Sequence, residues 1–182
     1  MGIPTLISTS TASDAASVDI TSGIDSTYDE YMFVFTDIHP ETDQANFTFQ
    51  FNADGGSGFN ETITSTAFSA YHRENDGAAV LGYATGKDQA QGTAYQQFDP
   101  EVDADNDSSI AGILHLFNPS STTYVKHFYS RSNNVLDSGA GSNNTSNSFI
   151  AGYINTTSAI DEISFKFSSG NMNGVIQMYG IA

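Results

Sequence analysis

Strict alternation of aromatic and polar residues is the feature of this chain that most restricts its fold. Residues 46–51 (NFTFQF) place three phenylalanines at every second position, and residues 163–167 (ISFKF) repeat the pattern. A period of two puts these rings on one face of a β-strand, whereas a helix would spread them around its circumference. We therefore expect amphipathic strands whose aromatic faces pack together.

Other apolar segments bring the candidate strands to seven or eight: residues 31–38, 112–117, 124–129, 149–154 and 175–181. Turn-forming residues 118–121 (NPSS) connect two of these segments, which predicts a β-hairpin. Residues 31–38 (YMFVFTDI) are apolar on both faces, as in a central strand that is covered on both sides. Clusters of Gly, Ser, Asn and Asp are predicted to form loops at residues 52–58, 103–109, 137–148 and 168–174.

Short strands separated by turn residues, without a convincing helical stripe, predict an all-β fold: an antiparallel two-sheet jelly-roll β-sandwich. We expect one domain at residues 25–182 and an extended N-terminal arm at residues 1–24. The arm is short-chained and nearly uncharged, so it suits pairing with a sheet edge, its own or a neighbour's. The predicted core consists of Phe33, Phe35, Phe47, Phe49, Phe51, Leu114, Leu116, Ile163, Phe165, Phe167, Ile176 and Met178.

The charge of the chain excludes several classes of function. Five Lys and Arg stand against 21 Asp and Glu, which gives a net charge of −16. Binding to nucleic acid by counterion release needs cations that this chain lacks, and an anionic membrane would repel it. No apolar run approaches the length of about 18 residues that spans a bilayer. Because cysteine is absent, disulfides and thiolate sites are excluded as well.

Sequence motifs for catalysis are missing. The chain has no GxSxG, SxxK or HExxH motif. A glycosidase needs only two well-placed carboxylates, but in so acidic a chain such a pair arises by chance. The candidate carboxylates are Asp29, Glu30, Glu41, Glu61, Glu74, Asp99 and Glu101. We expect no enzymatic activity.

Metal binding has two weak candidates. Asp103, Asp105 and Asp107 resemble the opening of a calcium loop, but Ser108 and Leu114 stand where an EF-hand needs Gly and Glu. The loop is either a loose Ca²⁺ site or a solvated loop, and no other cofactor is expected. The histidines at positions 115 and 127 lie on the two arms of the predicted hairpin, but a transition metal would need a further ligand.

Three tyrosines are the candidate contacts for a glycan. Tyr71, Tyr83 and Tyr95 lie in the Gly-, Ala- and Gln-rich middle of the chain, where the strand pattern is weakest, so we expect them on loops. Aromatic rings on loops offer contact area to sugars or protein partners at a low entropy cost. Alternatively, these tyrosines pack at the rim of the sandwich with solvated hydroxyl groups.

Several segments, taken in order, carry a resemblance to a known family. Residues 28–31 (YDEY) lead into the first apolar strand, residues 112–128 read GILHLFNPSSTTYVKHF, and residues 168–182 read SSGNMNGVIQMYGIA. A Tyr-x-x-Tyr opening, an NPSS hairpin and an ending of this type resemble the jelly-roll modules in virion proteins of tailed bacteriophages, many from marine hosts. The resemblance covers residues 3–182. Members of this family are tail-fibre, head-fibre or capsid-associated proteins without a catalytic motif.

The resemblance implies a non-enzymatic structural protein that is made in the host cytoplasm and displayed on the virion surface. It leaves two placements open: a tail-fibre or tip module that contacts host glycans, and a capsid decoration protein, of the cement or head-fibre type, bound to the major capsid protein. The implied partners are other virion proteins and copies of the chain itself, as a homotrimer or another symmetric oligomer. A secreted carbohydrate-binding module of bacterial origin is the alternative from a different class.

Overall fold

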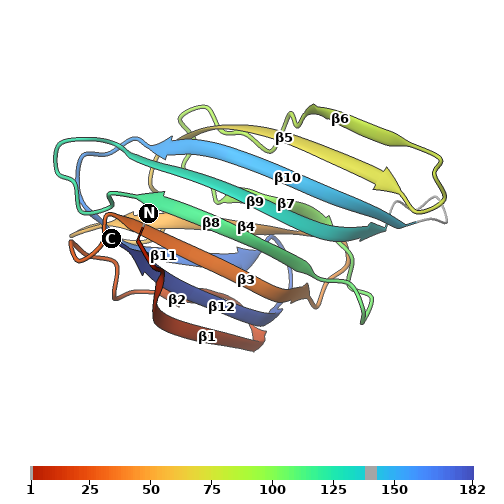
Figure 1. Cartoon of the computed structure of the whole chain (residues 1–182), viewed down its shortest axis with the longest axis horizontal. Helices are drawn as coiled ribbons and strands as arrows, with labels where there is room; N and C mark the ends of the chain where they lie inside the picture. The colour runs from red at the N-terminus through yellow and green to blue at the C-terminus, as the bar shows by residue number, and fades with distance from the viewer. Residues whose placement is uncertain (1, 138–142) are drawn as a thin grey trace.

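The chain folds into two antiparallel β-sheets that pack face to face (Figure 1). The computed structural model describes residues 2–137 and 143–182, which contain twelve strands and no helix. The prediction of an all-β, two-sheet antiparallel sandwich is confirmed. The number of strands exceeds the seven or eight expected, because several strands carry too few apolar residues to stand out in the sequence.

The larger sheet has eight strands and the smaller sheet has four. The order in the larger sheet is β1 (Thr5–Ala15), β12 (Met172–Ile181), β3 (Glu30–Pro40), β8 (Ile110–Phe117), β9 (Lys126–Asp137), β10 (Asn143–Ile154), β5 (Ile63–Arg73) and β6 (Ala79–Tyr83). The order in the smaller sheet is β2 (Val18–Ile20), β11 (Ile160–Phe167), β4 (Ala45–Ala53) and β7 (Gln96–Val102). β7 is the edge strand of the smaller sheet, and across the sandwich it packs mainly against β9 of the larger sheet. β5 and β6 therefore extend past the smaller sheet.

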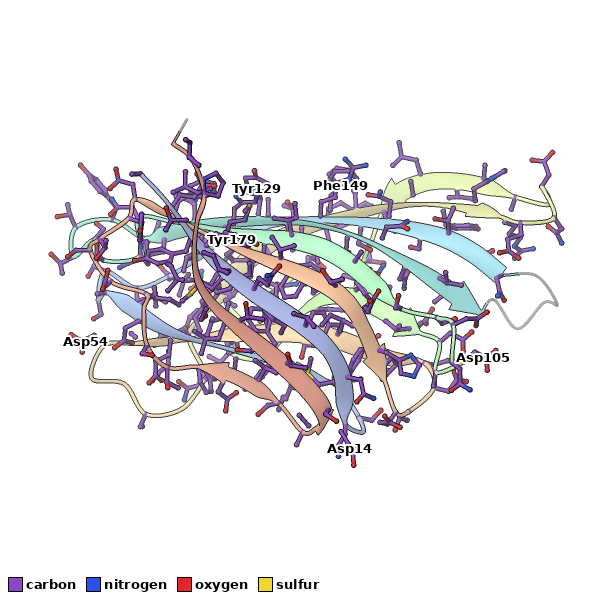
Figure 2. All side chains as sticks on the ribbon, turned by 60° about the horizontal axis from the view of Figure 1, so that its bottom comes forward. Asp14, Asp54, Asp105, Tyr129, Phe149 and Tyr179 are labelled. Carbon is purple, nitrogen blue, oxygen red and sulfur yellow. The ribbon has the colours of Figure 1, made fainter. Side chains whose placement is uncertain are left out.

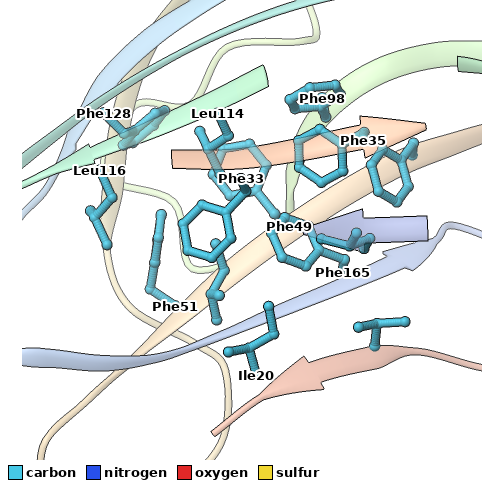
Figure 3. Packing of buried hydrophobic residues seen from close by; sticks show 14 of the residues in the cluster. Ile20, Phe33, Phe35, Phe49, Phe51, Phe98, Leu114, Leu116, Phe128 and Phe165 are labelled. Carbon is cyan, nitrogen blue, oxygen red and sulfur yellow. The ribbon is translucent and has the colours of Figure 1, made fainter. Parts of the chain in front are cut away.

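Aromatic side chains from both sheets form the core (Figure 3). Every residue predicted for the core is buried. The ring of Phe35 lies at the centre, with its centroid 5.5 Å from that of Phe47, 4.8 Å from that of Phe98 and 5.1 Å from that of Phe165. These pairs have the edge-to-face geometry that the quadrupoles of aromatic rings favour. The alternating pattern in β4 and β11 therefore forms the aromatic interface that it predicts.

The N-terminal segment is part of both sheets. β1 pairs with β12 at one edge of the larger sheet, and β2 pairs with β11 at one edge of the smaller sheet. Of the two alternatives for the arm, the structure has the first, since the arm covers edges of its own sandwich. β1 and β2 thereby become the edge strands in place of β12 and β11.

Two predictions about individual strands are wrong. The sequence predicts a loop at residues 137–148, but the described residues in this range belong to strands: β9 extends to Asp137 and β10 begins at Asn143. Residues 138–142 lie outside the described part of the chain. β9 and β10 pair along their whole length without a register shift, and the polar residues at these strand ends take part in that pairing. In addition, β3 is not covered on both faces: Met32 and Val34 point outward and are only half-buried, because no layer packs on that side of the larger sheet.

Candidate functional site

A groove opens where the smaller sheet ends at β7 and the larger sheet continues beyond it. Two hollows of about 600 Å³ and about 430 Å³ adjoin there and share Asn46, Gly86, Lys87 and Gln97 in their walls. They form one continuous depression, which we name the β7 groove. The side chains that matter for its chemistry are Tyr71, Arg73, Lys87, Tyr95, Asn144 and Lys166.

The groove exists because the inward face of the larger sheet changes from apolar to polar along the strands. In β10, the inward positions Ile154 and Ile150 are buried core residues, whereas Ser146 and Asn144 line the groove. β5 changes in the same way, from Ile63 in the core to polar residues at its far end. Alternation keeps these side chains on one face. The apolar part of that face packs on the smaller sheet, and the polar part forms a wall of the groove.

Buried glutamines fix the connection between β6 and β7, which forms another wall. Gln96 is fully buried; its Nε2 donates to the carbonyl of Lys87 at 2.7 Å, and its Oε1 accepts from the hydroxyl of Ser65 at 2.7 Å. Gln50 is also fully buried and donates to the carbonyl of Ala94 at 2.8 Å. Because a broken buried hydrogen bond is costly, these contacts hold the segment that carries Lys87 in one position.

Two of the three predicted tyrosines line the β7 groove, Tyr71 in one hollow and Tyr95 in the other. Tyr71 lies on β5 rather than on a loop, and Tyr95 precedes β7. The Tyr95 hydroxyl donates to Ser164 Oγ at 3.1 Å, and Lys166 Nζ lies 4.0 Å from the centroid of the Tyr95 ring. This cation–π contact and hydrogen bond hold the ring in place.

Tyr83 lies elsewhere. It is on β6 rather than on a loop, and its partner in the register is Phe68, which points to the opposite face of the sheet from Tyr71. The Tyr83 hydroxyl donates to Asp88 Oδ2 at 2.6 Å. The structure therefore separates Tyr83 from the other two candidate tyrosines, although all three belong to the same weakly patterned part of the chain.

Three of the five cationic residues of the chain, Arg73, Lys87 and Lys166, line the β7 groove. Burial lowers the pKa of Lys87, while the carboxylates of Asp99 and Glu101 act in the opposite direction. In a protein with a net charge of −16, this concentration of cations distinguishes the groove from the rest of the surface. None of the cationic side chains could be assigned to a common site from the sequence, because they come from β5, β11 and a loop.

A buried carboxyl group lies beneath the groove. Asp99 is 0% exposed, and burial raises its pKa to about 7, against the opposing effects of hydrogen bonds from Ser132 and Ser148 and of the charge on Lys87. Ser148 Oγ lies 3.3 Å from Asp99 Oδ1. Asp99 is not among the residues that line the groove, so a bound ligand would not touch it.

Several polar atoms at the groove have no hydrogen-bond partner within residues 2–137 and 143–182. They are Nε of Arg73, Oδ1 of Asn144 and Oε1 of Gln89. Asn144 is only 5% exposed, and its Oδ1 is buried. Buried polar atoms are nearly always paired in native proteins. These three atoms are themselves buried, so the polar surface that the groove offers to a ligand comes from other groups of its lining, among them the side chains of Lys87, Gln97 and Glu101.

The acidic loop is organised around its first carboxylate. Asp103 is buried; its Oδ1 accepts from the N–H of Asp105 at 2.9 Å and its Oδ2 accepts from the Ser108 hydroxyl at 3.4 Å. Asp105 and Asp107 are exposed. Within the described ranges, no three His, Asp or Glu side chains are grouped so that they could hold a metal ion. Binding of Ca²⁺ by this loop stays a prediction.

Sequence reasoning missed an aromatic surface on the outward face of the larger sheet. We name it the outer aromatic face; it consists of Phe68, His115, Phe117, Tyr129 and Phe149. The rings of Phe68 and Phe149 stack at 4.7 Å, and those of His115 and Tyr129 stack at 4.5 Å. Tyr129 and Phe149 point away from the smaller sheet (Figure 2). Phe68 is 45% and Tyr129 44% exposed. The signal was present in the sequence: residues 127–129 and 149–150 are apolar or aromatic at successive positions, and so on both faces.

His115 belongs to this surface rather than to a metal site. Its Nδ1 lies 2.5 Å from Glu30 Oε1, and its partner in the neighbouring strand is Tyr129, not His127. The histidine therefore joins β8 to β3 through the carboxylate and to β9 through ring stacking.

Comparison with models of known protein families, with curated proteins and with solved structures finds no match for this chain. In the described ranges, no helix is long and apolar enough to cross a membrane. Function is therefore inferred from the two surfaces above, the β7 groove and the outer aromatic face.

Proposed function

We propose that this chain is a non-enzymatic structural protein of a bacteriophage virion, displayed on the particle as a tail-fibre or tip module that binds host glycans in the β7 groove. The jelly-roll topology, the virion as its location and other virion proteins as its partners follow from the resemblance of residues 3–182 to phage modules. Glycan binding is supported by the groove.

One observation carries the proposal of glycan binding: the β7 groove combines aromatic rings with polar and charged side chains in its lining. Tyr71 and Tyr95 provide apolar ring surface, while Lys87, Gln97 and Glu101 line the same groove with groups that donate or accept hydrogen bonds. A sugar has apolar C–H faces and hydroxyl groups that both donate and accept, so it matches this combination. Binding sites of this kind typically join apolar walls to a few well-placed polar groups.

The arrangement of carboxyl groups supports binding without hydrolysis. Asp99 and Glu101 are the candidate carboxylates nearest to the groove, but Asp99 is 0% exposed and does not line it. Glycoside hydrolysis needs two carboxyl groups that both reach the scissile bond. Two carboxyl groups line the groove, Glu101 in one hollow and Asp88 in the other, and Asp88 Oδ2 already accepts a hydrogen bond from the Tyr83 hydroxyl. Because neither hollow is lined by two carboxyl groups, we infer that the groove holds a glycan without cleaving it.

A glycan array, followed by adsorption to host cells that carry the best ligand, tests this proposal. Tyr95→Ala and Gln97→Ala, at a side chain that lines both hollows, should each weaken binding about tenfold, as expected when an aromatic contact or a hydrogen bond to the ligand is lost. Tyr129→Ala is the matched control, because it removes a tyrosine from the opposite face and should leave glycan binding unchanged. Equal losses in Tyr95→Ala and Tyr129→Ala would contradict the assignment of the groove. Release of reducing sugar from any bound glycan would contradict the non-enzymatic role.

A second candidate function, capsid decoration, is favoured by the outer aromatic face. Monomeric proteins rarely leave a cluster of aromatic rings half-exposed unless it is a contact surface. A cement or head-fibre protein would bind the major capsid protein through such a face. In that case Tyr129→Ala would abolish binding to capsids, and Tyr95→Ala would not. Hundreds of copies per particle would place the protein on the shell, whereas a small multiple of three or six would place it on the tail.

The secreted carbohydrate-binding module is the remaining alternative, and it would use the same groove. Fractionation separates it from the virion protein. Copurification with phage particles supports the virion placement, whereas recovery only from culture medium without particles supports the secreted module. The homotrimer or other symmetric oligomer stays a prediction that sedimentation measures directly.

A further inference from the structure

β6 forms a free edge of the larger sheet and lacks the features that protect such edges. It is the last strand in the sheet order, and all its residues are exposed. Its pairing with β5 runs from Phe68↔Tyr83 to His72↔Ala79 without a register shift, so no bulge bends it away. Residues 77–86 (GAAVLGYATG) contain neither a charged residue nor a proline. A straight, uncharged and apolar edge is a template for another strand.

The other three edge strands in the described part of the chain are each protected. β1 has two register shifts, and Asp14 within it has a positive φ of 50°. β2 is only three residues long. β7 contains Pro100 and Glu101, and its pairing with β4 is interrupted by register shifts. Bulges, shortness, proline and charge are the means by which natural sheets prevent pairing at their edges. Their absence from β6 alone indicates that this edge has a partner.

The hydrogen bonds to β5 show which backbone groups of β6 are free. The N–H of Arg73 donates to the carbonyl of Ala78 at 3.0 Å, so Ala78 faces β5. In an antiparallel ladder, successive residues face opposite sides. Ala79, Leu81 and Tyr83 therefore direct their N–H and C=O groups to the open edge.

We propose that β6 pairs with β6 of a second copy of this chain, antiparallel and around a two-fold axis at Leu81. This register places Leu81 opposite Leu81 of the second copy, and Ala79 opposite Tyr83 of the second copy. Each facing pair exchanges two hydrogen bonds, so every free backbone group of the strand is used. A small side chain faces a large one on both sides of the axis. Such a contact is isologous, with the same patch on both molecules, and it closes after two copies.

The absence of charged residues at this edge allows a second copy of the acidic chain to approach it. Two molecules with a net charge of −16 repel each other, so they associate best through a surface without charges. Residues 77–86 form such a surface, and Leu81 and Tyr83 within it are 73% and 57% exposed. Stable complexes bury about 800 Å² per partner, and two paired strands of five residues bury less than that. We therefore expect a dissociation constant of about 1–100 μM, lower at high salt because salt screens the repulsion.

Engineered cysteines test the register, because the chain has no cysteine of its own. Val80 and Gly82 of the second copy would form a non-hydrogen-bonded pair with Cα atoms about 4.5 Å apart, within reach of a disulfide. A Cβ on Gly82 meets no atom within 4 Å, so cysteine fits there. The double variant Val80→Cys/Gly82→Cys should give a covalent dimer on oxidation, and each single variant should not. Equal cross-linking by a single variant would overturn the proposed register.

Sedimentation equilibrium of the full chain from about 1 to about 500 μM tests the dimer itself. The unaltered chain should pass from monomer to dimer in this range, and Leu81→Lys, which puts two cations at the axis, should stay monomeric. Tyr124→Lys is the matched control, since Tyr124 is 70% exposed on a loop, and it should dimerise like the unaltered chain. A monomer throughout, a trimer, or a Leu81→Lys variant that still dimerises would each overturn the proposal.

Discussion

Replacing Asp99 with asparagine should remove much of the pH dependence of this protein's stability. Asp99 is fully buried on β7, Ser148 is its hydrogen-bonding neighbour on β10, and its Oδ2 has no partner in the described part of the chain. Burial disfavours the charged carboxylate and raises the pKa from 3.8 to about 7. At pH 5 the folded protein therefore keeps a proton on Asp99 that the unfolded chain has released.

The size and sign of the effect follow from this difference in pKa. A rise of about three units corresponds to about 4 kcal/mol, at about 1.4 kcal/mol per unit. Because the folded-state pKa is the higher one, this stabilisation is fully present below the unfolded pKa of 3.8 and is lost as the pH rises through about 7. Between pH 5 and pH 8.5 the loss amounts to about 3 kcal/mol, a large share of the roughly 5–15 kcal/mol that stabilises a domain.

Urea unfolding at these two pH values measures the loss. Asp99→Asn has nearly the same volume and stays neutral, so it should match the unaltered protein at pH 5 and exceed it by about 3 kcal/mol at pH 8.5. Burial also raises the pKa of Asp161, but that group is present in both proteins and cancels in the comparison. Asp105→Asn, in an exposed loop, is the control. If the unaltered protein and Asp99→Asn lose the same free energy between the two pH values, the reasoning from burial is refuted.

Three further substitutions probe the core, a close approach and the wall of the β7 groove. Phe35→Ala should cost about 3–5 kcal/mol in urea unfolding, because it empties the centre of the aromatic core; a cost below about 1 kcal/mol would contradict the packing described. Gly152→Ala should lower the melting temperature, since a Cβ there would lie 2.5 Å from a backbone oxygen of Thr64, whereas Gly82→Ala meets open space and should change stability by less than about 0.5 kcal/mol. Gln50→Leu should destabilise by about 1–3 kcal/mol and speed hydrogen exchange in residues 84–95; unchanged exchange there would show that Gln50 does not hold the loop.

Much of the fold was predictable because its signal is local. The alternating rings around Phe47 and Phe165 imply two strands with one aromatic face each, and residues 118–121 connect two paired strands, β8 and β9. Near Asn144 the residues on both faces of the strand are polar, so the sequence shows no alternation of apolar and polar residues there. The sequence therefore predicted a loop there, although the backbone pairs with β9 and β5.

The candidate site was predictable only in part. Tyr71 and Tyr95 are separated in the sequence, and they line one groove because β5 extends past the smaller sheet while the connection to β7 folds back beneath it. Tyr83 has similar neighbours in the sequence, but it lies on β6 opposite Phe68, so its side chain is on the other face of the larger sheet from Tyr71. Which tyrosines share a site depends on strand register, and register is set by pairing between distant segments.

The amino-acid sequence by itself determined the all-β class, the aromatic core and the strongly acidic net charge, because residue type and spacing decide these properties. Only the tertiary structure decided that the sheets are unequal in width. That inequality leaves a polar overhang above β7, and β5 and β6 extend beyond the smaller sheet. The β7 groove is made where the smaller sheet ends and the larger sheet continues, and the outer aromatic face lies on the side of the larger sheet that no second layer covers. No local pattern in the sequence records either position, because both depend on how distant strands pair.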